Sequence, residues 1–188
     1  GLGDVYKRQA QELARQGVKP VSVAPHFSGE FEKGVEYQGD LNAFYRDFVA
    51  HQQIADHFGY KLSVHSGSDK FSVFSTVGRV TGGRVHVKTA GTNWLEAMRV
   101  VAAHDPALYR RAHKFAIERR SEAEKYYHVS TNPQDIPNIE LQSDAYLPEY
   151  LDLPASRQTL HIAYGLLLNE KWFADAFFPF MAAHEEEY

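Results

Sequence analysis

The chain has 188 residues, enough for one domain with a hydrophobic core. Its content of 44% hydrophobic and 13% aromatic residues is typical of a globular protein and excludes an intrinsically disordered one. The net charge of −4, without any long block of like charges, argues against a nucleic-acid-binding surface and against an anchor on anionic membranes.

Cysteine is absent, which excludes disulfides, a catalytic thiolate and cysteine-bound zinc. No apolar stretch approaches the ~18 residues of a membrane span, and no signal peptide is recognisable. We therefore expect a cytoplasmic protein.

The first residues have an unusual composition. Residues 4–9 match the translation of one frame of a transposon end used in preparing sequencing libraries. We interpret residues 1–9 as a sequencing or cloning scar, the alternative being a genuine amphipathic N-terminal turn. On this interpretation the gene is cut upstream, and residues 10–188 are the C-terminal part of a single barrel domain.

Short β-branched runs alternate with amphipathic runs along the chain. Asp40 is expected to cap a helix that Gly59 ends, and Asp105-Pro106 to open another. Ser156 is expected to cap a last, long helix after an irregular, proline-rich loop over 132–153. Strands are predicted at 21–24, 61–64, 84–87 and 125–129.

This alternation predicts the α/β class with a parallel sheet. A full barrel needs eight strands and typically about 250 residues, so we predict a TIM-like (β/α) barrel with about its C-terminal half present. A small open doubly wound sheet is the alternative. The chain has no glycine-rich loop of the nucleotide-binding types after any strand, so nucleotide binding has no local support.

Polar residues gather where the predicted strands end. In barrels and open parallel sheets this edge carries the active site. The residues at the four strand ends are His26, then His65 with Asp69 and Lys70, then Lys88 with Thr89, and His128 with Ser130.

Each of these residues also has a purely structural interpretation. The small residues between His65 and Asp69 let a ligand approach the backbone, or they form an ordinary turn in which Asp69 caps the next helix. Lys88 is suited to bind a carboxylate or to act as an acid, or it is a solvated lysine. His128 is suited to bind a metal ion, or it is a hydrogen-bonded core histidine.

Other titratable groups carry no assigned role. His161 taken alone indicates a structural residue, and Glu185–Glu187 indicate a solvated face. The histidines expected on helix surfaces are His51, His57, His104 and His113.

Five blocks of the sequence together resemble one known family. They are residues 27–34, 65–72, 86–97, 127–130 and 157–161, and they are similar to the tagaturonate epimerases. The resemblance implies a metal-dependent, barrel-like enzyme of hexuronate catabolism that interconverts tagaturonate and fructuronate.

The resemblance also implies roles for individual residues. The expected ligands of a divalent metal cation are His128 and His161, with His65 as the candidate third ligand from this chain. A further ligand and an acid/base residue are expected upstream. Asp69 is the predicted catalytic base, and Lys88 the group that holds a carboxylate or donates a proton. The residues predicted to bind the sugar acid are Lys33, Ser66, Lys70 and Thr89.

The two sugar acids differ at a carbon β to the ketone, so simple enolisation does not interconvert them. Retro-aldol cleavage and re-addition is one route, and direct proton transfer on both faces of the carbon is the other. Two further functions use the same residues: a metal-dependent aldolase or ketose isomerase acting on a neutral sugar, and a non-catalytic domain that binds sugar acids.

Overall fold

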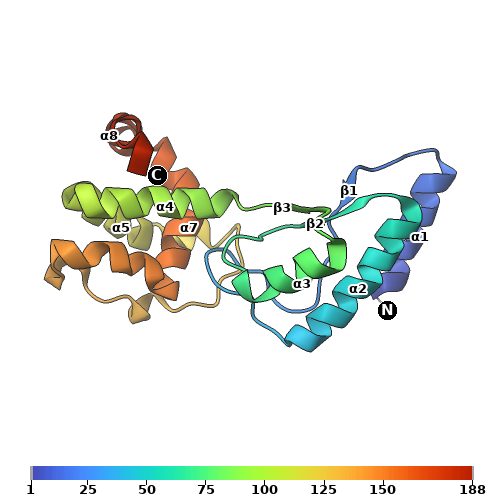
Figure 1. Cartoon of the computed structure of the whole chain (residues 1–188). Coiled ribbons are helices and arrows are strands. Elements are labelled where there is room, and N and C mark those ends of the chain that lie inside the picture. Colours follow the sequence, from blue (N-terminus) through green and yellow to red (C-terminus); the bar gives the residue numbers. More distant parts are fainter. Residues whose placement is uncertain (1, 188) are drawn as a thin grey trace. The chain divides into compact units, whose positions relative to one another are not determined.

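The computed structural model describes the backbone of residues 2–187 and the side chains of residues 4–89 and 91–187. The chain divides into two compact units (Figure 1). Unit 1 comprises Gly1–Phe31 and Glu36–Thr89, and unit 2 comprises Glu32–Val35 and Ala90–Tyr188. Each unit has a hydrophobic core of its own.

Unit 1 contains a parallel sheet in the order β1-β2-β3, and helices connect its strands. Val23 lies opposite Leu62, and Val64 lies opposite Val87. The prediction of an α/β fold with a parallel sheet is confirmed. The elements are α1 (Leu2–Arg15), β1 (Ser22–Val23), α2 (Leu41–Phe58), β2 (Lys61–Val64), α3 (Phe71–Thr81) and β3 (Val85–Val87).

Local sequence signals explain the helix that covers this sheet. The carboxylate of Asp40 accepts hydrogen bonds from the backbone N–H of Asn42 at 2.7 Å and of Ala43 at 3.2 Å, which starts α2. Gly59 ends α2 in the left-handed region with φ 77°. Phe44 and Phe48 on this helix are fully buried, 5.4 Å apart between ring centroids. Both predicted ends of α2 are confirmed.

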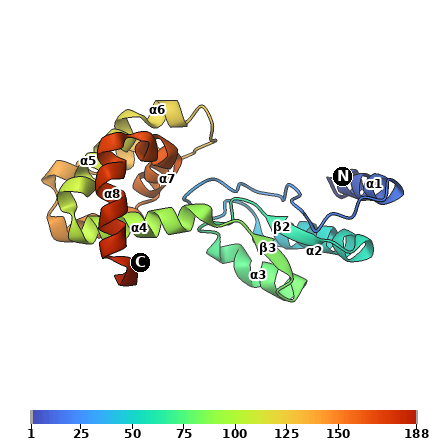
Figure 2. The ribbon, with the colours of Figure 1, turned by 90° about the horizontal axis from the view of Figure 1, so that it is seen from above.

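The described part of unit 2 contains helices joined by turns and coil and no strand, and Figure 2 shows α7 and α8 side by side. Asp105 accepts a hydrogen bond from the Leu108 N–H at 2.9 Å, so the predicted start of α5 is confirmed. The elements are α4 (Ala90–His104), α5 (Pro106–Glu118), α6 (Arg120–Ala123), η1 (Pro133–Asp135), η2 (Ile139–Leu141), η3 (Asp144–Asp152), α7 (Pro154–Asn169), α8 (Lys171–Ala183) and η4 (Glu185–Glu187), where η marks a 3₁₀ helix.

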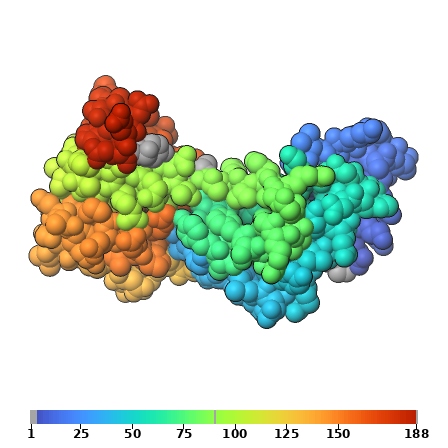
Figure 3. Space-filling view, in the orientation of Figure 1, coloured from blue at the N-terminus to red at the C-terminus, as the bar shows by residue number. Residues whose placement is uncertain are grey.

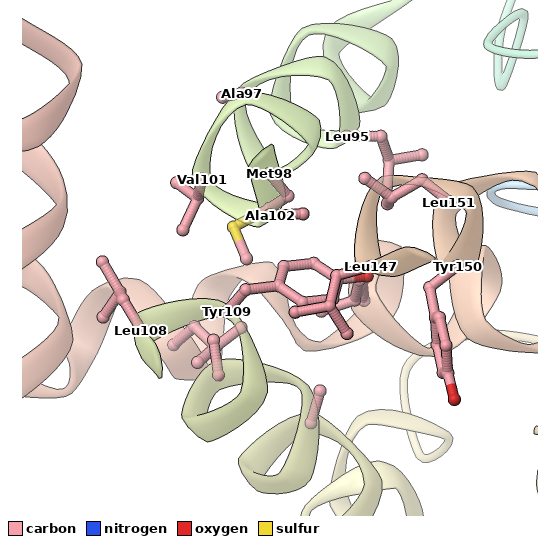
Figure 4. Packing of buried hydrophobic residues seen from close by; sticks show 14 of the residues in the cluster. Leu95, Ala97, Met98, Val101, Ala102, Leu108, Tyr109, Leu147, Tyr150 and Leu151 are labelled. Carbon is pink, nitrogen blue, oxygen red and sulfur yellow. The ribbon is translucent and has the colours of Figure 1, made fainter. Parts of the chain in front are cut away.

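The core of unit 2 lies between these helices. Met98 from α4, Tyr109 from α5 and Leu147 from η3 meet there, and all three are fully buried (Figure 4). Apolar area removed from water at such a meeting point stabilises the fold by roughly 25 cal/mol per Å². The described helices of both units include none that is long and apolar enough to cross a bilayer.

The predicted strand at 125–129 is wrong. These residues continue from α6 as turns and coil, and Tyr126 is 77% exposed. Tyrosine and valine favour strands only where a neighbouring strand accepts their backbone hydrogen bonds, and the described part of unit 2 has no strand. The described residues therefore form three parallel strands and not a four-stranded half-barrel.

Four smaller predictions also fail. The proline-rich loop contains η1, η2 and η3, and α7 and α8 are separate helices. Ser156 does not cap a helix, because it lies inside α7, where its hydroxyl is 2.7 Å from His113 Nε2. His51 and His113 are buried, at 2% and 0% exposure, and not on helix surfaces.

The interpretation of residues 1–9 as a scar stays a prediction. Residues 2–9 lie within α1, and Gly1 lies outside the described residues.

Candidate functional site

In unit 1, parallel pairing of β2 with β3 brings the carboxyl ends of the two strands together. The backbone N–H of Gly67 donates to the carbonyl of Lys88 at 3.0 Å, and the N–H of Lys88 donates to the carbonyl of Val64 at 3.0 Å. The loop 65–70 therefore lies beside Lys88 and Thr89, at one edge of the sheet.

Packing holds this loop in an uncommon conformation. Ser66 and Asp69 adopt φ values of 54° and 60°, in the region that disfavours residues other than glycine. A Cβ on Gly67 would lie 2.4 Å from the Cγ1 atom of Val87, so only glycine fits against β3. The loop thus has the strained, tightly packed backbone that is common at binding sites.

The predicted residues of this edge differ in exposure. Asp69 and Lys70 are buried, and the Lys70 ammonium donates to the carbonyl of Ser68 at 3.0 Å. Asp69 does not cap α3, because Lys70 occupies the N-cap position without a side-chain cap bond. The exposed residues are His65, Lys88 and Thr89, while Ser66 is half-buried.

In unit 2 the central group is the carboxylate of Glu32, whose side chain is 4% exposed. Its Oε2 atom accepts three hydrogen bonds: from the backbone N–H of Ser130 at 2.9 Å, from the Ser130 hydroxyl at 2.8 Å and from Gln158 Nε2 at 3.0 Å. Its Oε1 atom lies 3.5 Å from Nε2 of His128. Ser130 and Gln158, which are 98 and 126 residues from Glu32 in the sequence, therefore meet at its carboxylate.

Two opposing effects act on the pKa of Glu32. Burial raises it, whereas the hydrogen bonds from Gln158 and Ser130 and the nearby His128 lower it. The second group of effects prevails, and the pKa lies below the ordinary value of 4.5. Glu32 is therefore an ionised, buried carboxylate near neutral pH.

A chain of side-chain hydrogen bonds holds the segment that carries His128. The hydroxyl of Thr131 donates to Gln158 Oε1 at 2.7 Å. Arg120, which is 4% exposed, donates to the carbonyl of Thr131 and, at 2.6 Å, to the hydroxyl of Thr159. Because residues 128–131 are coil without a strand partner, these bonds to α7 fix their position.

His161 lies one turn after Gln158 on α7 and is 6% exposed. Its ring packs against Gly91, where a Cβ would lie 1.9 Å from the His161 Cε1 atom. Gly34, with φ 70°, lies against the same helix, and a Cβ there would be 3.1 Å from the Cα of Gln158. Two glycines thus make room for α7 at Gln158 and His161.

The metal ligands predicted from the sequence are distributed as follows. His128, with its side chain 80% exposed, and His161 both lie near the Glu32–Gln158 pair, while His65 is exposed in unit 1. Imidazole and carboxylate are suitable ligands of divalent ions. Over the described residues, the ligand atoms of Glu32, His128 and His161 do not gather within 4.8 Å as a group of three. The donor types fit a divalent ion, but these three residues do not close a ligand set around one.

Sequence reasoning missed Glu32 and Gln158. Both lie inside blocks that carry the family resemblance, yet only Lys33 and His161 were selected from those blocks. Lys33, which is half-buried, contributes its carbonyl, which accepts from Gln158 Nε2 at 3.0 Å. The one sequence signal near Glu32 is Gly34, two positions later, which packs against α7 at Gln158.

Comparison with known proteins identifies the family. The sequence profile described as "UxaE: tagaturonate epimerase" matches residues 8–188. The chain belongs to the tagaturonate epimerase family. The resemblance found in the sequence is thereby confirmed, and the matched range contains every residue of the two clusters described above.

Solved and curated tagaturonate epimerases agree with this. Crystal structures of the fructuronate-tagaturonate epimerase of Cohnella laeviribosi, one complexed with glycerol and one native, are 51% identical with a TM-score of 0.95. They match 99% and 98% of this chain and 39% of theirs. The tagaturonate/fructuronate epimerase of Thermotoga maritima is 40% identical over 177 residues, 94% of this chain. The chain spans 37% of the length of that relative.

Proposed function

We propose that this chain contributes to an epimerase that interconverts tagaturonate and fructuronate in the cytoplasm. The observation that carries the proposal is the family match over residues 8–188, together with 51% identity to an epimerase of that printed specificity. We also propose that the sheet of unit 1 is part of a (β/α) barrel, because its parallel strands alternate with helices.

The epimerase is proposed to require a divalent metal cation. His128 and His161 are the residues of unit 2 that would hold it, and the ionised Glu32 beside His128 favours a cation there. A bound divalent ion supplies Lewis acidity toward the ketone of the sugar acid. His65 as a further ligand stays a prediction from the sequence.

The proposed reaction is a retro-aldol cleavage followed by re-addition. A base takes the proton of the hydroxyl on the β carbon, and the bond between the α and β carbons breaks into an aldehyde and an enediolate. The aldehyde rotates and the same bond re-forms on its other face, which inverts that carbon. Asp69 is the proposed base, because its carboxyl is buried in the strained loop after β2.

The substrate carboxylate needs a cationic partner. Lys88 is exposed at the end of β3 and is proposed to bind that carboxylate or to donate a proton. Hydroxyl and ammonium donors are suited to the hydroxyls of the sugar acid. The residues proposed for that binding are Lys33, Ser66, Lys70 and Thr89.

Product analysis tests the proposal. The protein is stripped of metal, incubated with tagaturonate with and without added divalent ions, and the sugar is followed by NMR. Appearance of fructuronate only with added metal is the expected result. Three-carbon products would support an aldolase instead, and binding without conversion would support a sugar-acid-binding domain.

A further inference from the structure

A second group of potential metal ligands lies in unit 2 away from Glu32. His104 is the last residue of α4, His184 follows α8, and Glu187 ends η4. Figure 3 shows α8 on the surface of this unit. Over the described residues, these three are the one group of three potential ligands whose ligand atoms all lie within 4.8 Å of one another.

The three ligand atoms are close enough to reach one ion. His104 Nε2 lies 2.5 Å from Oε2 of Glu187 in an ion pair, and the rings of His104 and His184 have centroids 5.1 Å apart. Two ligands of a tetrahedral ion lie about 3.3 Å apart, so a bound ion would replace the ion pair and separate these two atoms by a small side-chain movement. Nδ1 of His184 lies 2.8 Å from the carbonyl oxygen of Phe180. Since a carbonyl only accepts, Nδ1 is the donor and Nε2 keeps its lone pair in the neutral ring.

A backbone carbonyl behind the ring is the arrangement that orients metal-binding histidines in proteins. The ring of His184 is also stacked on Phe180, with centroids 4.1 Å apart and planes at 21°. Both contacts fix the direction in which the His184 Nε2 lone pair points.

The local electrostatics favour a cation. His104 and His184 both stand at helix carboxyl ends, where unpaired carbonyls carry partial negative charge. Glu185 and Glu186 add negative charge next to Glu187. A solvent-open hollow gives access to the group, and it is lined by Glu96, Arg99, Val100, Ala103, His104 and Glu187.

One positive charge lines that hollow, and it is compensated. Arg99 Nε donates to Glu96 Oε2 at 3.1 Å, and its Nη2 donates to Asp152 Oδ1 at 2.9 Å. The guanidinium is therefore directed at two carboxylates of its own, which leaves the field at His104 set by the helix ends and the glutamates.

We propose that His104, His184 and Glu187 bind one divalent ion of the zinc class. Two imidazoles and one carboxylate are a ligand set that Zn²⁺ uses in proteins, with water in the remaining position. The ion would connect the end of α8 to the end of α4 and hold the last turn, η4, in place. His104 and Glu185–Glu187 are exposed, as the sequence predicts. The proposal adds a ligand role for His104 and Glu187 to that surface position.

Zinc stoichiometry tests this site independently of the epimerase reaction. The protein is dialysed against low-micromolar Zn²⁺, and the metal bound per chain is measured for wild type, His104→Ala and Glu187→Gln. Both substitutions are expected to remove one zinc equivalent, or to weaken its binding at least about tenfold in a titration. His57→Ala and Glu118→Gln, both exposed and outside this group, are the matched controls, expected to keep the wild-type stoichiometry.

Circular dichroism of each variant checks that the fold is kept, and the near-isosteric Glu187→Gln change keeps the test usable if His104→Ala disturbs α4. Unchanged zinc content in both variants would overturn the proposal. So would a wild-type protein whose entire zinc content disappears in a His128→Ala, His161→Ala double variant.

Discussion

The two units position their polar residues by different means. In unit 1 the backbone ladder between β2 and β3 brings the loop 65–70 beside Lys88, as a strand pattern predicts. In unit 2 the segment with His128 has no ladder, and side-chain bonds among Glu32, Thr131 and Gln158 hold it against α7. Strands can be predicted from the periodicity of a single amino-acid sequence, whereas a network between distant side chains cannot.

The largest expected effects come from the separate hydrophobic cores. Phe48→Ala in unit 1 and Phe173→Ala in unit 2 each remove a fully buried ring and should lower the free energy of unfolding by about 3–5 kcal/mol. Far-UV circular dichroism during denaturation measures both changes.

Tryptophan fluorescence assigns each effect to its unit, because both tryptophans, Trp94 and Trp172, lie in unit 2. Phe173→Ala should shift the fluorescence transition more than Phe48→Ala does. Equal shifts would contradict the division into two cores.

The buried carboxylate of unit 2 gives the next largest effect. Glu32→Gln replaces an acceptor of three hydrogen bonds with an amide and should lower stability by about 1–3 kcal/mol at pH 7. The exposed Glu118→Gln on α5 is the control, and it should change stability by less than about 0.5 kcal/mol. Equal stability of both variants would contradict a central role of Glu32 in this hydrogen-bond network.

The same pair of proteins has a predictable pH dependence. The folded-state pKa of Glu32 is below the ordinary 4.5, so folding favours its ionised form. Its contribution is complete above about pH 4.5 and is lost as the pH falls through the lower, folded-state pKa. The stability difference between wild type and Glu32→Gln, followed by urea denaturation, should therefore shrink below pH 4.5. A stability difference that grows as the pH falls would contradict the lowered pKa of Glu32.

The close contact between Gly91 and His161 predicts that adding a methyl group at Gly91 lowers activity, although no polar side chain is removed. Gly91→Ala places a Cβ 1.9 Å from the imidazole, so the ring must move, and epimerase kcat/KM should fall by up to about 100-fold. Gly165→Ala on the helix that carries His161 is the control. A Cβ there meets nothing within 4 Å, and it should stabilise by about 0.5–1 kcal/mol without loss of activity.

The smallest effects concern helix starts, where the N-caps predicted from the sequence are confirmed in both units. Asp40→Ala and Asp105→Ala each remove an N-cap acceptor and should cost about 1 kcal/mol of stability by thermal denaturation. Asp175→Ala, which breaks the exposed pair with Lys171, should cost less than about 0.5 kcal/mol. A cap effect no larger than this control would contradict the assigned helix starts.

These contrasts explain how far the sequence alone was informative. Asp40, Gly59 and Asp105 have local partners within four residues, so their roles could be predicted. The strand expected at 125–129 failed because strand formation depends on a distant partner. Glu32 was missed for the same reason, since its partners Ser130 and Gln158 are 98 and 126 residues away.

Turnover by histidine variants tests most directly whether the cluster around Glu32 is part of the active site. Metal-dependent conversion of tagaturonate is measured by NMR for His128→Ala, His161→Ala and, as the control, His57→Ala on α2. We expect kcat/KM to fall at least about 100-fold in the first two, with reduced metal content, and to be unchanged in the control. Full turnover and normal metal content in His128→Ala and His161→Ala would contradict the account.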